Sequence, residues 1–112
     1  MAIITDIAGM KINSSLTVET IDNTTPTIKN NVFSIITATP TSINVNVPNN
    51  EICNAICQFT ASSNANMPTL TYNNTESFKM NAGSVSTVTM GKTYQISFLN
   101  DCCTIAEFNE LS

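Results

Sequence analysis

Arginine, histidine and tryptophan are absent from this 112-residue chain, and only three of its residues are glycine. Without histidine, no side chain has an unperturbed pKa near neutrality, so the commonest general base is missing. Without arginine, there is no bidentate clamp for a carboxylate or a phosphate. The four lysines are scattered and the net charge is −4, so no basic patch can neutralise a nucleic-acid backbone. These absences predict a protein that is not an enzyme and binds no nucleic acid.

The familiar catalytic signatures are missing as well. The sequence contains no G-x-S-x-G, no H-E-x-x-H, no phosphate-binding glycine loop and no dinucleotide-binding fingerprint. None of the carboxylates begins a spaced acidic loop of the calcium-binding kind. We therefore expect no catalytic residue, no cofactor and no metal. The chain start lacks the basic and apolar regions of a signal peptide, and no apolar run is long enough for a membrane span, so we expect synthesis in a cytoplasm and no membrane.

Asparagine (16), threonine (17) and serine (11) dominate what is present, whereas charged residues supply only 11% of the chain. Hydrophobic residues, at 42%, are as frequent as in ordinary globular proteins. A chain of this length forms one domain by the usual size range. The composition therefore predicts a single ordered domain over residues 1–112 with a polar but weakly charged surface.

Alternation of apolar and polar residues with a period of two, typical of half-buried strands, recurs along the chain. Strands are therefore predicted from alternation or from flanking turn residues at 10–18, 31–39, 41–47, 69–72, 76–80, 85–90 and 93–99. In the last of these, Tyr94, Ile96 and Phe98 are expected to face the core. Segment 31–39 is apolar at odd and even positions alike, which is typical of a central strand.

Two segments fit more than one structure. Residues 51–61 fit a strand or a helix, and the strand is preferred because strands are predicted on both sides. After Asn100, the tail fits either a short helix or a last strand. Short strands separated by turn signals every ~8 to 12 residues favour antiparallel sheets. We therefore predict an all-β fold, a single antiparallel β-sandwich, with the short C-terminal helix as the open alternative.

The four cysteines are Cys53, Cys57, Cys102 and Cys103. Buried free thiols are the preferred interpretation, and one or two disulfides are the alternative. A zinc site built from all four thiolates is disfavoured by geometry. On a strand, Cys53 and Cys57 would lie about 13 Å apart, and the adjacent pair Cys102-Cys103 would point to opposite faces.

The last third of the chain carries a recurrent pattern. Ser77-Phe78-Lys79-Met80-Asn81-Ala82-Gly83 is an apolar strand ending in Ala-Gly, and Gly91-Lys92-Thr93-Tyr94-Gln95-Ile96-Ser97-Phe98 follows after a Thr/Ser-rich strand. The pattern resembles the closing hairpins of small Ig-like β-sandwiches. With the Asn/Thr/Ile-rich, arginine-free composition, it also resembles the auxiliary or decoration proteins on tailed-phage capsids. The vicinal cysteines after Asn100 depart from the pattern, and no functional residue is carried over from it.

The resemblance implies a bacteriophage virion protein that sits on the capsid surface and stabilises contacts between coat subunits. Its partners would be other protein subunits, chiefly a major capsid protein, and itself as a homo-oligomer. Residues 1–9 are expected to form a flexible N-terminal arm that contacts the partner through Ile3, Ile4 and Ile7. A glycan-binding or adhesin module is the alternative function, for which an exposed Tyr72 beside asparagine side chains would be the starting point.

Overall fold

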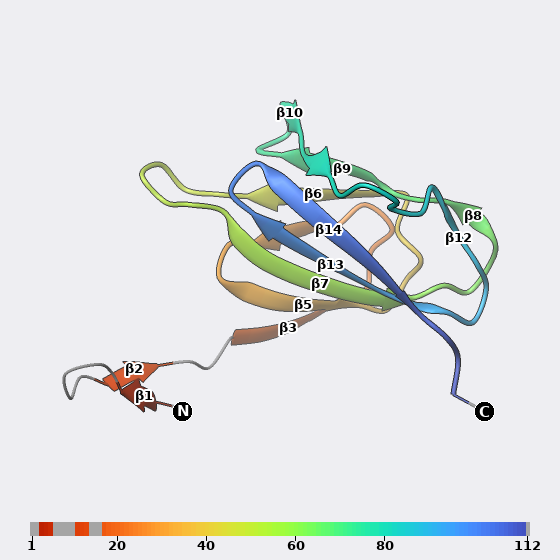
Figure 1. The fold of residues 1–112 in the computed structure, drawn as a ribbon, viewed down its shortest axis with the longest axis horizontal. Coiled ribbons are helices and arrows are strands. Elements are labelled where there is room, and N and C mark those ends of the chain that lie inside the picture. Colours follow the sequence, from red (N-terminus) through yellow and green to blue (C-terminus); the bar gives the residue numbers. More distant parts are fainter. Residues whose placement is uncertain (1–2, 6–10, 14–16, 112) are drawn as a thin grey trace.

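Every regular element of residues 3–5, 11–13 and 17–111, the part of the chain that this computed structural model describes, is a β-strand (Figure 1). The predicted all-β class is therefore confirmed. A six-stranded sheet has the order β11-β14-β13-β7-β5-β3, and a four-stranded sheet has the order β10-β9-β6-β4. Two further pairs, β1-β2 and β8-β12, are separate two-stranded sheets.

The six-stranded sheet consists of β3 (Thr17–Ile21), β5 (Val32–Ile36), β7 (Asn54–Thr60), β13 (Thr93–Leu99), β14 (Cys102–Phe108) and β11 (Lys79–Met80). The four-stranded sheet consists of β4 (Thr27–Lys29), β6 (Ser42–Asn46), β9 (Thr69–Tyr72) and β10 (Glu76–Ser77). The small pairs are β1 (Ile3–Thr5) with β2 (Lys11–Asn13), and β8 (Ala65–Asn66) with β12 (Thr87–Val88).

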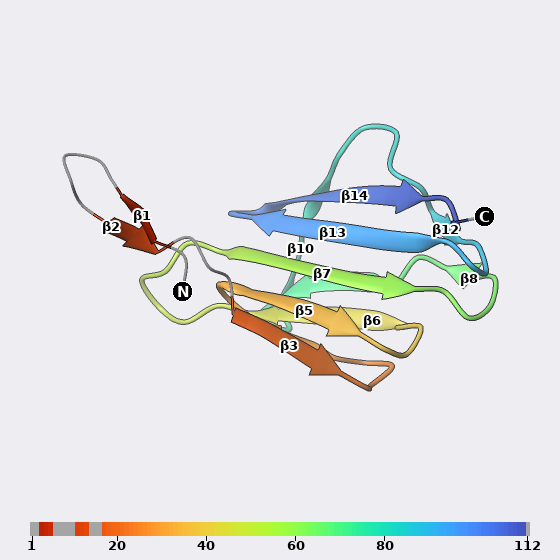
Figure 2. The ribbon, with the colours of Figure 1, turned by 90° about the horizontal axis from the view of Figure 1, so that it is seen from below.

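Between β3 and β9 the chain winds back and forth between the two large sheets. Strands β3, β5 and β7 lie side by side and parallel in one sheet, and the intervening β4, β6 and β9 lie parallel in the other (Figure 2). Each winding therefore adds one strand to each sheet. The hairpin of β13 and β14 then pairs antiparallel against β7 and extends the six-stranded sheet.

The predicted antiparallel sandwich is therefore wrong in strand direction, because both large sheets are mixed. Two parallel neighbours need a crossover of a dozen or so residues between them. Here the crossover is itself a strand of the opposite sheet, as β4 is between β3 and β5. A period-two pattern reports which face of a strand is buried and carries no information on its direction, so the sequence did not distinguish the two arrangements.

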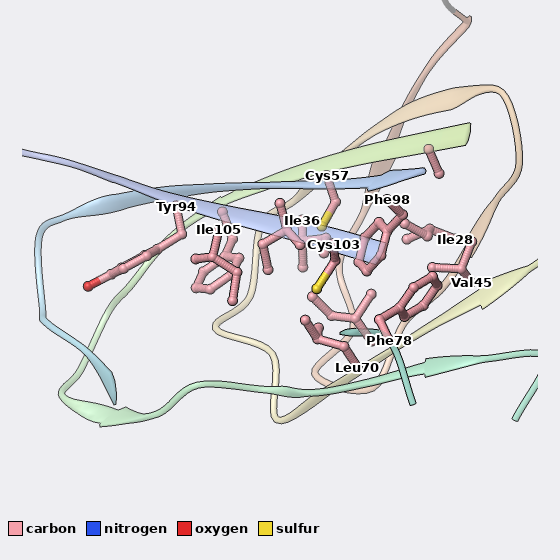
Figure 3. Packing of buried hydrophobic residues seen from close by; sticks show 14 of the residues in the cluster. Ile28, Ile36, Val45, Cys57, Leu70, Phe78, Tyr94, Phe98, Cys103 and Ile105 are labelled. Carbon is pink, nitrogen blue, oxygen red and sulfur yellow. The ribbon is translucent and has the colours of Figure 1, made fainter. Parts of the chain in front are cut away.

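One buried cluster lies between the two large sheets and takes side chains from both, an arrangement compatible with a β-sandwich (Figure 3). The aromatic rings are central to it. Phe59 stacks on Tyr94 with ring centroids 5.4 Å apart, and Phe78 contacts Phe98 at 4.8 Å. Tyr94, Ile96 and Phe98 are all at most 1% exposed, so the predicted inward face of β13 is confirmed.

The two ambiguous segments are both strands. Residues 54–60 form β7, which confirms the preferred interpretation. The C-terminal helix is wrong: residues 102–108 form β14, which pairs with β13 at seven consecutive positions. The reason is the alternation of Cys103 and Ile105, both buried, with exposed residues, a period of two that a strand satisfies and a helix does not.

Asparagine side chains hold the windings together. Five of them, in the described part of the chain, accept a hydrogen bond from a backbone N–H more than 20 residues away, at 2.6 to 3.1 Å. The pairs are Asn30 with Asn54, Asn44 with Asn74, Asn64 with Met90, Asn73 with Val47, and Asn81 with Ile105. These five asparagines therefore satisfy backbone N–H groups both in loops and on the strands β7 and β14.

Tyr94 fixes the closing hairpin through its hydroxyl. The backbone N–H of Thr89 donates to this oxygen at 2.7 Å, and the hydroxyl donates to the Glu107 carboxylate at 2.7 Å. The hydroxyl of this buried tyrosine thus ties the start of β13 to the backbone five residues upstream. The ring is fully buried, so these two bonds satisfy a polar group that would otherwise be costly inside the core.

Candidate interaction surfaces

The outer face of the six-stranded sheet carries no charged residue on its five long strands. Alternation along β3, β5, β7, β13 and β14 buries one set of side chains and turns the other outward. The outward set is Val18, Thr20, Phe33, Ile35, Asn54, Ile56, Gln58, Thr60, Thr93, Gln95, Ser97, Leu99, Cys102, Thr104, Ala106 and Phe108. We call this set the outer sheet face. It contains no aspartate, glutamate or lysine.

Apolar side chains gather at the β3–β7 side of the outer sheet face. Register places Val18 beside Phe33, and Phe33 beside Ile56, in one row across three strands. Val18 is 57% exposed, whereas Phe33 and Ile56 are half-buried. Two further exposed apolar residues, Leu99 and Phe108, lie on β13 and β14. The face is therefore partly hydrophobic although no other element of the described chain covers it.

The polar members of the outer sheet face bond to each other. Gln95 Nε2 donates to Gln58 Oε1 at 2.8 Å, and the hydroxyls of Thr60 and Thr93 lie 2.8 Å apart. Both pairs are cross-strand neighbours on β7 and β13. Because these groups are already hydrogen-bonded, covering them would leave few donors or acceptors unsatisfied.

The outer face of the four-stranded sheet is different in chemistry. Its outward residues are hydroxyl, amide and ammonium groups, from β4, β6 and β9: Thr27, Lys29, Ser42, Asn44, Asn46, Thr69 and Thr71. Asn44 is only 9% exposed, and its Oδ1 accepts hydrogen bonds from the Thr71 hydroxyl and the Asn74 backbone N–H. The two outer faces of the molecule therefore differ, and only the outer sheet face carries large apolar side chains.

Among the strands that the structure describes, both large sheets end in an edge strand at the side of the molecule where the winding begins. β3 is the last strand of the six-stranded sheet and β4 the last of the four-stranded sheet. Lys29 Nζ of β4 lies 2.8 Å from Glu19 Oε1 of β3, which joins the two edges. An edge strand presents unpaired N–H and C=O groups, and charge on it discourages unwanted pairing. We call β3 and β4 together the open winding.

Two of the three predicted arm residues lie in a described strand. Ile3 and Ile4 lie in β1, which pairs antiparallel with β2 and, among the described strands, with no other. Ile7 lies outside the described residues. In Figures 1 and 2, β1 and β2 lie apart from the two large sheets. A flexible arm over residues 1–9, and its place within a single domain, stay predictions.

The four cysteines are free thiols, three of them buried and Cys102 exposed. Cys57 and Cys103 both point into the core cluster (Figure 3), but β13 lies between their strands. Two strand spacings, roughly 9.5 Å, exceed the reach of a disulfide. Burial raises the pKa of the Cys57 thiol to about 12 and that of Cys103 to about 11. The pKa of Cys102 is also raised, chiefly by its hydrogen bond to Asp101.

A small cleft of about 160 Å³ lies beside the end of β9. Tyr72, half-buried, and Phe78 form its apolar part, and Glu76, Asn100 and Asp101 supply polar groups. Asp101 also pairs with Lys79 at 3.0 Å. Tyr94, the other tyrosine, is buried in the core and takes no part. An aromatic ring beside carboxylates and an amide is the chemistry expected of a sugar site.

Among the residues that the structure describes, no group of three or more cysteine, aspartate or glutamate side chains is placed to hold a metal ion. Nor does any helix there have the length and apolarity to cross a membrane.

The sequence did not identify the outer sheet face. The signal was present in segment 31–39, where Phe33 and Ile35 stand at positions that alternate with the core residues Val32 and Ile36. Apolar residues at odd and even positions alike predict a central strand, whereas in the structure Phe33 and Ile35 face outward.

No protein-family model, no curated protein and no solved structure matches this chain.

Proposed function

We propose that this chain is a non-enzymatic assembly protein, an auxiliary subunit that binds the outside of a phage capsid and stabilises contacts between coat subunits. The observation that carries the proposal is the open winding. Two sheets end at the same side of the molecule, in short strands joined by one exposed ion pair between Lys29 and Glu19. Such an edge can accept a strand or loop of a neighbouring protein by backbone hydrogen bonding.

The finer architecture belongs to the same proposal. A sandwich closed by a tyrosine corner at Tyr94 supports the likeness to small Ig-like domains over the last third of the chain. The parallel windings before it depart from the antiparallel pairing of those domains. The likeness is therefore proposed for the closing hairpin of β13 and β14 alone.

The arm supports attachment in a second way. Ile3 and Ile4 belong to an isolated two-stranded pair, and such a hairpin has only marginal stability in water. Contact with a coat subunit would order it and bury its isoleucines, with Ile7 as the third predicted contact. Binding of this kind stabilises the particle by mass action, because the subunit binds only the assembled lattice.

Quantitative mass spectrometry of density-purified particles from the source culture tests the proposal. A copy number comparable to that of the coat subunit is expected. Two variants locate the contact: deletion of residues 2–7 and the edge substitution Thr27→Lys should both lower occupancy without lowering the melting temperature. Thr69→Lys, on an interior strand of the same sheet, is the matched control and should leave occupancy unchanged. Absence of the chain from particles would refute the proposal.

A glycan-binding module is the second candidate, favoured by the cleft beside Tyr72. Its polar groups, Glu76, Asn100 and Asp101, lie around a half-buried aromatic ring. A glycan array with the whole chain should then give specific hits that Asp101→Asn and Glu76→Gln abolish. No hit, or hits that both variants retain, would leave the assembly function as the sole proposal.

A further inference from the structure

We propose that the outer sheet face is where two copies of this chain pair, sheet against sheet, around a two-fold axis. The inference does not depend on capsid binding. Assembly with a coat subunit is assigned to the open winding and the arm, whereas the homodimer is assigned to the broad surface of the six-stranded sheet.

Charge is the first argument for a second copy as the partner. In a two-fold dimer the same patch meets itself, so every charge on it faces a patch bearing the same charge. The chain has a net charge of −4, and random association of two copies would bring carboxylates together. The one carboxylate of the described residues that reaches the outer sheet face is Asp101, at the edge beside Cys102, where Lys79 pairs with it at 3.0 Å. The rest of this face bears no charge, so the broad, partly apolar surface of this acidic protein can meet itself with little repulsion.

Desolvation is the second argument. The polar groups near the middle of the face form the pairs Gln58–Gln95 and Thr60–Thr93 within one copy. A differently charged partner would find no ion to pair with there, and a partner with many donors would find most acceptors occupied. A second copy brings the same satisfied groups, so the two layers can meet with little loss of hydrogen bonding to water.

Area is the third argument. Five strands spaced at about 4.8 Å span roughly 20 Å; β7, β13 and β14 have seven residues each and are about 23 Å long, whereas β3 and β5 have five each and are about 17 Å long. Packing two such faces at the usual ~10 Å separation of stacked sheets covers a footprint of roughly 400 Å² on each copy, on the order of 1,000 Å² in total once side-chain relief is included. That is about the lower limit for a specific protein–protein interface.

The row of Val18, Phe33 and Ile56 gives the interface its hydrophobic part. Neighbouring strands hold these side chains in register, with Ile35 one pleat further along β5. Phe33 and Ile56 are only half-buried within one copy, so a facing sheet would complete their burial. Large apolar residues surrounded by uncharged polar ones are the usual composition of an interface core.

The test is the mass of the full chain in solution, measured by light scattering and sedimentation from micromolar to submillimolar concentration. We expect a reversible dimer. Ile56→Glu should raise the dimer dissociation constant roughly 100-fold or more, because each copy then presents the new carboxylate to its twin. Thr69→Glu is the control: it adds the same charge at an exposed position on the outer face of the four-stranded sheet, and it should leave the dissociation constant unchanged.

A second variant at two exposed positions keeps the test valid if Ile56→Glu fails to fold. Val18 and Leu99 are 57% and 61% exposed, so the double variant Val18→Glu/Leu99→Glu should fold normally and still weaken the dimer. A spin label on Cys102, the exposed thiol of the same face, should report one distance between labels in the dimer and none in the variants. A monomer at submillimolar concentration, or a dimer that both charged variants leave intact, would overturn the proposal.

Discussion

Asn73 should contribute more to stability than its place in a surface turn suggests. Its side chain brackets Val47: Oδ1 accepts the Val47 N–H at 2.7 Å, and Nδ2 donates to the Val47 carbonyl at 3.0 Å. The Asn73 N–H also donates to the Val45 carbonyl at 2.9 Å. The amide therefore continues the pairing of β6 with β9 for one more residue, by a side chain in place of a strand. We predict that Asn73→Gly destabilises the protein strongly.

The expected loss follows from the two bonds. Val47 is 3% exposed, so its N–H and C=O would be left largely without water when the amide is removed. Each hydrogen bond is worth about 1 kcal/mol net, and an unsatisfied buried group costs about 1–3 kcal/mol, so the free energy of unfolding should fall by roughly 2–4 kcal/mol. Glycine is the informative substitution because Asn73 has a φ of +48°, which alanine would adopt only with strain.

Asn50→Gly is the matched control. Asn50 has a similar φ of +67°, and its side chain makes no hydrogen bond within the described part of the chain. Its replacement should change the free energy of unfolding by about 0.5 kcal/mol or less, as at an ordinary surface site. Urea unfolding followed by tyrosine fluorescence or circular dichroism measures both variants. Equal free energies of unfolding for Asn73→Gly and Asn50→Gly would refute a stabilising role for the two Asn73–Val47 hydrogen bonds.

Three further predictions concern buried or paired groups. Ser34→Ala should raise the free energy of unfolding by about 1 kcal/mol, because its buried hydroxyl has no hydrogen-bond partner among the described residues. The exposed Ser97→Ala is the control, and a lower free energy of unfolding for Ser34→Ala would contradict the reasoning. Tyr94→Phe should destabilise at pH 7, and its deficit in urea unfolding should shrink as the pH falls through the folded-state pKa of Glu107. The Tyr94 hydroxyl lowers that pKa, so its stabilisation is present above the unfolded-state pKa and lost in acid. Alkylation counted by mass spectrometry should modify Cys102 first in the native protein, faster as the pH rises, and all four thiols only in urea; early labelling of a second thiol would show that the core opens.

The strands that the sequence predicts best are those with one buried face and one solvent-exposed face. Segment 93–99 coincides with β13, and 41–47 contains β6 with Ile43 and Val45 buried as alternation requires. Segment 85–90 was overestimated, since only Thr87–Val88 is a strand. The difference is partnership: β13 has a long strand on each side, whereas β12 pairs only with the two residues of β8.

Segment 10–18 shows the limit of the same signal. Its alternation predicted one strand, but the described residues place 11–13 in β2 and 17–21 in β3, with Val18 57% exposed. Val18 lies outward on an edge strand, where alternation no longer means burial. The interaction surfaces escaped prediction for a related reason: an apolar residue that faces a partner and one that faces the core give the same pattern in a sequence.

The wound topology and the unusual composition have a common physical cause. Each passage from one sheet to the other leaves loop amides and carbonyls that no strand can pair, and buried groups of this kind must be satisfied. Asparagine suits the task, since its short side chain offers a donor and an acceptor and its backbone tolerates positive φ, as at Asn31, Asn73 and Asn100. Five asparagines of the described chain therefore hold the windings together through backbone N–H groups, although most asparagine side chains stay exposed. Charge is scarcest on the outer sheet face, whose long strands carry no carboxylate or lysine. A partner can therefore approach this surface with the least cost of desolvating charged groups.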